Sequence, residues 1–279
     1  MNEGLLFLLL IVAGVSLYLG GRRGREREKQ GRRDVLLATP LSIEWRGYLE
    51  ANVPLYQRIP ENLKQQVEGH TQVLLSEIVF EGHGGLTMSD EIRVTIAGQA
   101  SFLLLNQKCW FPDSLRAVIV YPGVYMARTV QSGVGELYTE SEQPVLGQSW
   151  DAGVVVLSWD NARHTAANPC DGHNLVLHEF AHQLDQATGA ADGAPVLEGR
   201  PRQRDWWRAL SQTYADFNKD LERGSSTVMN DYGATNPAEF FAVATETFFE
   251  KPRQLRDRRP ELYNELCYYY RTDPLEWPG

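Results

Sequence analysis

The stretch LVLHEFAHQLD, residues 175–185, carries two histidines four positions apart, with a glutamate directly after the first. On an α-helix, positions i and i+4 lie on one face, so the side chains of His178 and His182 project side by side. Two imidazoles placed in this way bind one Zn²⁺ ion, and Glu179 next to the metal then acts as a general base. The alternative is an amphipathic helix whose polar residues have no joint role. The H-E-x-x-H spacing favours the metal.

A catalytic zinc needs a third protein ligand and one open position for water. The position six residues after His182, where one class of zinc peptidases has a further histidine, is occupied by Thr188. His164 and His173 are close in the sequence. However, His173 lies five residues before His178 and would point from a different helix face. The third ligand is therefore expected elsewhere in the chain.

Better candidates lie in NDYGATNPAEFFAVATETFFE, residues 230–250. Asn236 and Pro237 are typical of a helix cap and a first helical position. Glu239 and Glu246 then share a helix face, seven residues or about two turns apart. A carboxylate from this second helix would complete a His₂Glu site. Spacing does not decide between the two, because a glutamate at the third helical position, such as Glu239, often reaches back to the N–H of the cap.

Composition and charge narrow the class of protein. The chain has 279 residues, 43% hydrophobic and 23% charged, which is ordinary for a globular protein of one or two domains. Residues 22–33 hold seven Lys/Arg and two Glu, whereas the chain from Asp34 onward holds 20 basic and 33 acidic residues. An acidic main domain argues against nucleic acid as a partner, because phosphate binding needs concentrated positive charge. The three cysteines have no C-x-x-C spacing, which suits a reducing compartment.

The N-terminus predicts a membrane anchor. Residues 4–21, GLLFLLLIVAGVSLYLGG, form an uncharged run that would be about 27 Å long as a helix, close to the hydrocarbon thickness of a bilayer. The leader MNE has no basic residue and no A-x-A cleavage site follows, unlike a signal peptide. We predict a transmembrane anchor over residues 1–21, a basic juxtamembrane linker over 22–35 and the main domain over 36–279. The basic residues predict a single-pass protein of the inner (cytoplasmic) membrane with its domain facing the cytoplasm, and they can contact anionic lipid headgroups.

The elements that must position the motifs follow from hydrophobic spacing. Apolar residues at helical spacing predict helices over residues 42–59, 60–78, 90–106, 172–187, 202–222, 237–250 and 260–271. Runs rich in Val and Ile predict strands over residues 78–82, 116–123 and 153–160, with loops and a hairpin over 127–150. The fold class is α+β, with a short sheet before a helical lobe. We expect substrate backbone to pair with the edge of the strand near Val154–Leu157.

These motifs resemble a known family. HEFAHQLD followed by DYGATNPAEFFAVATETFF closely resembles the Mlc titration factor A (MtfA)-like zinc metallopeptidases, whose catalytic core is related to that of anthrax lethal factor. The likeness extends over nearly the whole soluble part, including VIVYPG, GQSW…VVLSW and YYYRTDPL. It implies a zincin-like fold of gluzincin type, one Zn²⁺ ion, and hydrolysis of peptides or proteins, with aminopeptidase-type cleavage of short peptides.

The resemblance assigns roles to residues. His178 and His182 match the ligating histidines, and Glu179 matches the catalytic glutamate, which takes the proton of the metal-activated water and delivers it to the leaving amine. The third ligand is the glutamate of the PAE motif, which is Glu239 here.

Three further residues receive supporting roles. Glu246 becomes a residue that orients a histidine through its free ring nitrogen. Asp185, nearly one turn after the second histidine, is another candidate for this role, the alternative being a solvent-facing carboxylate. Tyr232 matches a tyrosine that hydrogen-bonds the reacting oxygen in the related toxin, the alternative being core packing with a satisfied hydroxyl.

The chain departs from the soluble members of that family in its apolar segment LLFLLLIVAGVSLYL. Localisation and partner are therefore not carried over, and binding to a sugar-system transcriptional repressor is implied by resemblance alone. The alternative function is a membrane-tethered regulatory or binding protein of the same fold, with a structural zinc and no significant hydrolysis. A structural site would be closed by four protein ligands, whereas only three can be named.

Overall fold

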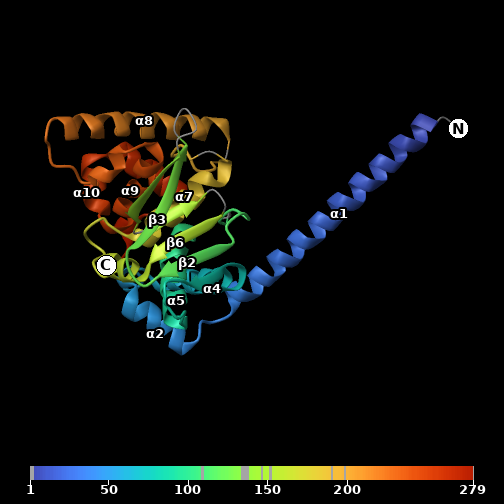
Figure 1. Ribbon diagram of the computed structural model, residues 1–279, viewed down its shortest axis with the longest axis horizontal. Coiled ribbons are helices and arrows are strands. Elements are labelled where there is room, and N and C mark those ends of the chain that lie inside the picture. Colours follow the sequence, from blue (N-terminus) through green and yellow to red (C-terminus); the bar gives the residue numbers. More distant parts are fainter. Residues whose placement is uncertain are drawn as a thin grey trace.

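The computed structural model describes residues 3–107, 110–132, 138–145, 147–150, 153–189, 191–197 and 199–278. Cys109 and residues 133–137 of the predicted hairpin region lie outside this part of the chain. A compact body carries one long helix, α1 (Glu3–Ala38), which extends away from it to the N-terminus (Figure 1).

The body is built from ten further helices and six strands in the described residues. The helices are α2 (Ile43–Asn52), α3 (Pro54–Arg58), α4 (Glu61–Glu77), α5 (Asp90–Ser101), α6 (Trp159–Ala166), α7 (Leu175–Asp185), α8 (Arg200–Glu222), α9 (Pro237–Glu250), α10 (Pro252–Arg258) and α11 (Pro260–Tyr270). The strands are β1 (Val79–Gly82), β2 (Ala117–Tyr121), β3 (Tyr125–Ser132), β4 (Tyr138–Val145), β5 (Gly147–Trp150) and β6 (Val154–Ser158). The small sheet and the helical lobe predicted from the sequence are both present.

The main sheet has the strand order β1-β2-β6-β5, in which β1, β2 and β6 are parallel and β5 is antiparallel to β6. Alternate residues of β2, Val118 and Val120, are fully buried, as are Val155 and Leu157 of β6. The expectation that substrate would pair with the edge of residues 154–157 is wrong, because β6 is hydrogen-bonded on both sides. In the described sheet, β5 is the outer strand beside it.

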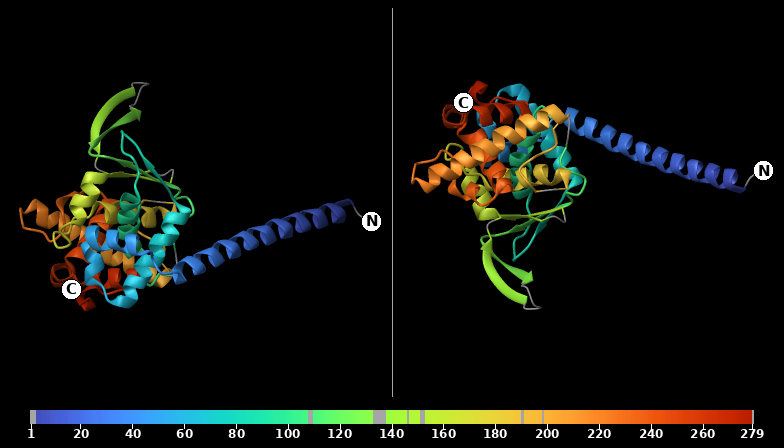
Figure 2. Two further views of the ribbon diagram at one scale, coloured as in Figure 1. Left: turned by 90° about the horizontal axis from the view of Figure 1, so that it is seen from below. Right: turned by 90° about the horizontal axis from the view of Figure 1, so that it is seen from above.

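A two-stranded ribbon, β3 and β4, extends from the body as a separate antiparallel sheet (Figure 2). Its register pairs Tyr125 with Val145 and Ser132 with Tyr138. This agrees with the hairpin predicted in that part of the sequence.

Helices α7 and α9 form the buried centre of the helical lobe. Every residue of α7 is buried, and so is every residue of α9 from Phe240 to Glu250, as expected for helices that are apolar on most faces. Both helices begin at an asparagine cap: the Asn174 side chain accepts a hydrogen bond from the Leu177 N–H, and Asn236 accepts one from the Glu239 N–H. In Figure 1, α8 lies across the end of this lobe, and α2, α4 and α5 lie at the opposite end of the body.

The C-terminal part of α1 is held against the body by charged contacts. The Arg33 guanidinium binds both oxygens of Glu77 at 2.7 and 2.6 Å and stacks 4.3 Å from the Trp110 ring centre. Lys29 donates to Asp113 at 2.6 Å. The boundary predicted between linker and domain, at residues 35 and 36, thus falls inside a continuous helix.

No helix within the described part of the chain is long and apolar enough to cross a membrane. This finding gives no support to the anchor predicted over residues 4–21, and the side chains of residues 3–19 lie outside those that the structure describes. The inner-membrane location stays a prediction from the sequence.

One glycine, directly before β6, lies against the backbone of the segment that leads into β2. Gly153 has φ +74°, and a Cβ atom there would lie 1.8 Å from the backbone oxygen of Ser114. We expect Gly153→Ala to lower the free energy of unfolding by at least about 3 kcal/mol, because backbone must move to relieve the overlap. Chemical denaturation measures the loss.

Gly85→Ala is the matched control. Gly85 has φ +86° but no atom within 4 Å of a built Cβ, so only the left-handed backbone conformation is penalised. That penalty is about 1–2 kcal/mol. Equal losses in the two variants would contradict the close approach at Gly153.

Candidate metal centre

Helix α7 presents its two histidines to one another. The His178 and His182 rings are 4.9 Å apart between centres, and their Nε2 atoms are 3.3 Å apart. The four-residue spacing brings them together, as predicted from the helix period. Both rings are largely buried.

Glu239, from the first turn of α9, reaches the same point. Its Oε2 atom lies 3.0 Å from the Nε2 atom of His178 and 3.3 Å from that of His182. Within the described residues these three side chains form a group whose ligand atoms could hold one metal ion. A pair of imidazoles and a carboxylate from two separate helices therefore converge.

Glu246 contacts the His178 ring on the side away from the other two candidate ligands. Its Oε1 atom is 2.7 Å from the Nδ1 atom of His178. The two glutamates that sequence spacing could not separate thus contact opposite ring nitrogens of the same histidine. Since a carboxylate is only an acceptor, the Nδ1 atom carries a proton, and in the neutral ring this leaves the lone pair of the Nε2 atom for a metal ion.

The donor set fits a divalent cation of the zinc class. Two ring nitrogens and a carboxylate oxygen lie 3.0–3.3 Å from one another, a spacing that needs positive charge between them, either ring protons or a metal ion. Ligands about 2.0–2.1 Å from a tetrahedral zinc are separated by about 3.3 Å, which matches these distances. Burial raises the pKa of Glu239, but the two histidines overcome this and lower it to about 2. Burial lowers the pKa of His178, but carboxylates, with Glu246 foremost, raise it well above its usual value.

Glu179 is buried next to this group. Its Oε2 atom has no hydrogen-bond partner among the described residues. Burial raises the pKa of Glu179 to about 7, although the neighbouring histidines act in the opposite direction. A buried carboxyl with an unused oxygen and a pKa near neutrality can accept and release a proton.

Tyr232 lies at the open side of the group, in the 3₁₀ turn Asp231–Ala234. The residue is 55% exposed, and its ring centre is 5.9 Å from that of His178. Burial and then the carboxylates of Glu239 and Glu179 raise the pKa of its hydroxyl. The hydroxyl therefore stays protonated and able to donate a hydrogen bond. With this exposure, Tyr232 is not a core residue.

Asp185 is buried, so it is not the solvent-facing carboxylate considered as an alternative. Its Oδ2 atom accepts a hydrogen bond from the Gly193 N–H at 2.9 Å. This contact fixes the loop after α7. A role of Asp185 in orienting His182 stays a prediction.

His173 is the residue that sequence reasoning undervalued. From the sequence, His173 is considered only as a metal ligand. In the structure its Nδ1 atom lies 3.2 Å from the Oε2 atom of Glu246, the residue that contacts His178. That hydrogen bond raises the pKa of His173. The available signal was a pair of glutamates, Glu246 and Glu250, one turn apart in a helix whose other residues are mostly apolar. Buried acids in such a helix require polar partners.

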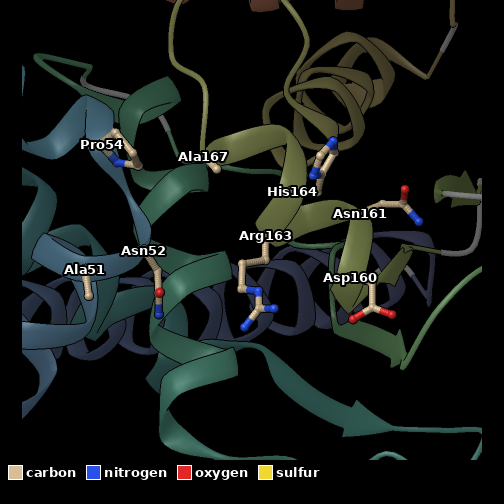
Figure 3. Close-up of a pocket in the computed structure, with 8 residues that line it drawn as sticks. All are labelled: Ala51, Asn52, Pro54, Asp160, Asn161, Arg163, His164 and Ala167. Atoms are coloured by element: carbon tan, nitrogen blue, oxygen red, sulfur yellow. The ribbon is translucent and has the colours of Figure 1, made fainter.

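His164 lies apart from the metal-ligand group. It lines a cavity of about 690 Å³ between the α2–α3 segment and α6, shown in Figure 3. Arg163 and Asp160 lie on the same wall, and no residue of the metal-ligand group lines this cavity. This cavity is therefore separate from the three residues that could bind a metal.

Comparison with known proteins agrees with this geometry. The family model described as glucose-regulated metallo-peptidase M90 matches residues 25–271. An uncharacterized protein of Synechocystis sp. is 36% identical over 271 residues, covering 96% of this chain and 97% of that protein. Mlc titration factor A of Yersinia pestis (strain Pestoides F) and of Yersinia pseudotuberculosis (strain YPIII) are each 30% identical over 229 residues, covering 80% of this chain and 83% of those proteins.

The family resemblance inferred from the two motifs is confirmed by these matches. The family implies a metal, and the two histidines and Glu239 offer a group that could hold one. The chain belongs to the glucose-regulated metallo-peptidase M90 family.

Proposed function

We propose that this protein is a zinc-dependent peptidase that hydrolyses peptide bonds with Glu179 as the general base. The observation that carries the proposal is the convergence of two ring nitrogens and one carboxylate oxygen beside a buried carboxyl that has an unpartnered oxygen. In this proposal His178, His182 and Glu239 hold the zinc. Bound zinc supplies a lowered pKa for water and polarises the scissile carbonyl.

Glu179 moves the protons. Its carboxylate takes a proton from the attacking water and later gives it to the leaving amine. Burial raises the pKa of Glu179 to about 7 in the metal-free protein, and a bound cation lowers it, so the carboxylate is ionised at neutral pH and able to take a proton from water. Burial excludes competing solvent from the oxygen that does this work.

Tyr232 donates a hydrogen bond to the oxyanion that develops on the substrate carbonyl. Its exposure at the rim lets it reach a bound substrate, and its raised pKa keeps the proton in place. We place the substrate backbone along β5, the outer strand next to β6 in the described sheet, where extended peptides can add a strand. The preference for aminopeptidase-type cleavage of short peptides rests on the family resemblance.

A regulatory role is the second candidate, and the name of the Yersinia relatives, Mlc titration factor A, favours it. In that case zinc only joins α7 to α9 and hydrolysis is insignificant. The group of three ligands in the described residues argues for the enzyme, since structural zinc sites are closed by four.

Zinc should stabilise the folded protein. We expect addition of zinc to metal-free protein to raise the melting temperature, with a gain of about 4 kcal/mol at a thousand times the dissociation constant. His182→Ala and Glu239→Ala should each remove most of this gain. His83→Ala, at an exposed histidine of the loop after β1, should keep it. Differential scanning fluorimetry gives the result, and variants that respond as fully as the wild type would refute the ligand assignment.

Replacement of the general base tests the enzymatic role. Glu179→Gln should lower peptide hydrolysis at least about 100-fold, because the proton acceptor is lost, while bound zinc stays near one per chain. Fluorogenic aminoacyl amides and internally quenched peptides, assayed with and without chelator, provide the readout. Glu81→Gln, at an exposed carboxylate of β1, is the matched control. Full activity in Glu179→Gln would refute the base, and a zinc-loaded wild type that cleaves no peptide would favour the regulatory role.

The rate should depend on the charge of Glu179. Only the ionised carboxylate accepts a proton, so kcat/KM should fall as the pH drops through its pKa. Burial raises that pKa to about 7 in the metal-free protein, and a nearby cation lowers it, so half-maximal kcat/KM is expected at or below pH 7. A pH–rate profile measures this, and kcat/KM that increases as the pH falls below 7 would be incompatible with the mechanism.

A further inference from the structure

The loop that leads into α7 is held by two carboxylates of α9, one turn apart. Glu250 accepts hydrogen bonds from the Gly172 and His173 N–H groups at 3.1 and 3.0 Å, and from the Asn174 side chain at 3.2 Å. Glu246 accepts one from the Asn174 N–H at 2.5 Å. The backbone of residues 172–174 is therefore fixed relative to the helix that carries Glu239.

Glu246 lies between two imidazole rings. One oxygen is 2.7 Å from the Nδ1 atom of His178, and the other is 3.2 Å from the Nδ1 atom of His173. The side chain of Glu246 is 1% exposed, whereas that of His173 is 49% exposed. Histidine, carboxylate and histidine thus form a continuous series of close polar contacts from the metal-facing ring to the surface.

We propose that His173 is a positioning residue of the metal centre: through Glu246 it fixes the His178 ring in the orientation that binds zinc. The proposal rests on the zinc site of the proposed function and adds to it a residue outside the ligands.

The charge of Glu246 explains why a partner is needed. Within the described part of the chain it forms no ion pair with lysine or arginine, and its other contacts are His178 and one backbone N–H. A buried carboxylate is costly unless each oxygen is hydrogen-bonded. Without the His173 ring, each carboxylate oxygen keeps a single donor, His178 for one and the Asn174 N–H for the other, and the carboxylate is held less firmly against the Nδ1 atom of His178. The ring would then be less firmly oriented, and partners of this kind change metal affinity 10–100-fold.

The geometry defines a sharp set of variants. Asparagine places an amide N–H near the position of a histidine Nδ1, whereas glutamine places it farther out, near Nε2. His173→Asn should therefore keep the donor to Glu246, and His173→Gln should lose it. His173→Leu removes all hydrogen bonding, and His164→Leu, at an exposed histidine of α6, is the matched control.

Zinc affinity of the full-length chain, measured by competition with a chromophoric chelator, is the first readout. We expect His173→Leu and His173→Gln to bind zinc about 10-fold more weakly, and His173→Asn and His164→Leu to stay within about 2-fold of the wild type. The second readout is the visible absorption of the Co²⁺-substituted protein, which should change in the first two variants only. Melting of the metal-free proteins identifies any variant that is simply unstable. If leucine does not fold, the Asn and Gln pair decides.

Two results would overturn the proposal. Unchanged zinc affinity in both His173→Leu and His173→Gln would show that the ring does not position His178. Equal weakening in Asn and Gln would show that the donor at the Nδ1 position is not what matters. A wild type that binds no zinc would instead refute the proposed function itself, and this inference with it.

Discussion

The site depends on two contacts that α9 makes with the imidazole ring of His178, one at each ring nitrogen. The His178 ring has Glu246 at its Nδ1 atom and Glu239 at its Nε2 atom, at 2.7 and 3.0 Å. Both carboxylates come from one helix and are two turns apart, so the ring is bracketed as long as α7 and α9 keep their relative position. That position is set by apolar packing, since both helices are buried over nearly their whole length. The packing of α7 against α9 therefore also sets the positions of the two carboxylates at His178.

This arrangement is costly for stability. Glu179, Glu246 and Glu250 are all buried, and burial alone raises the pKa of each. Hydrogen bonds from the loop before α7 reach Glu246 and Glu250, although the pKa of Glu250 stays raised to about 8, and one Glu179 oxygen has no partner in the described structure. A fold does not retain such a group for stability, because an apolar residue of similar size would cost less. The concentration of buried acids around two histidines is understandable if a cation binds there, and this supports a functional rather than structural origin.

Helix periodicity and capping preferences predicted the features of this molecule that lie within single helices. The Asn236 cap, the extent of α9 and the shared face of His178 and His182 follow from helix period and capping chemistry. The strand order did not follow, because strands with similar apolar composition do not specify their neighbours, and β6 proved to be interior. Glu239 and Glu246 could not be distinguished by spacing, since residues seven apart share a face. Only the position of His178 between them separates their roles. His173 was missed for the same reason: it lies in the loop before α7 and its partner is on α9, and sequence periodicity describes only neighbours along one helix.

The most direct test is X-ray absorption at the zinc edge of the purified, zinc-loaded protein. The account predicts one zinc per chain with two imidazole nitrogens and carboxylate oxygen at about 2.0–2.2 Å, and a clear loss of the imidazole signal in His178→Ala. Sulfur in the first coordination shell at about 2.3 Å, or the same spectrum in that variant, would contradict the convergence of the two histidines and Glu239 on one ion.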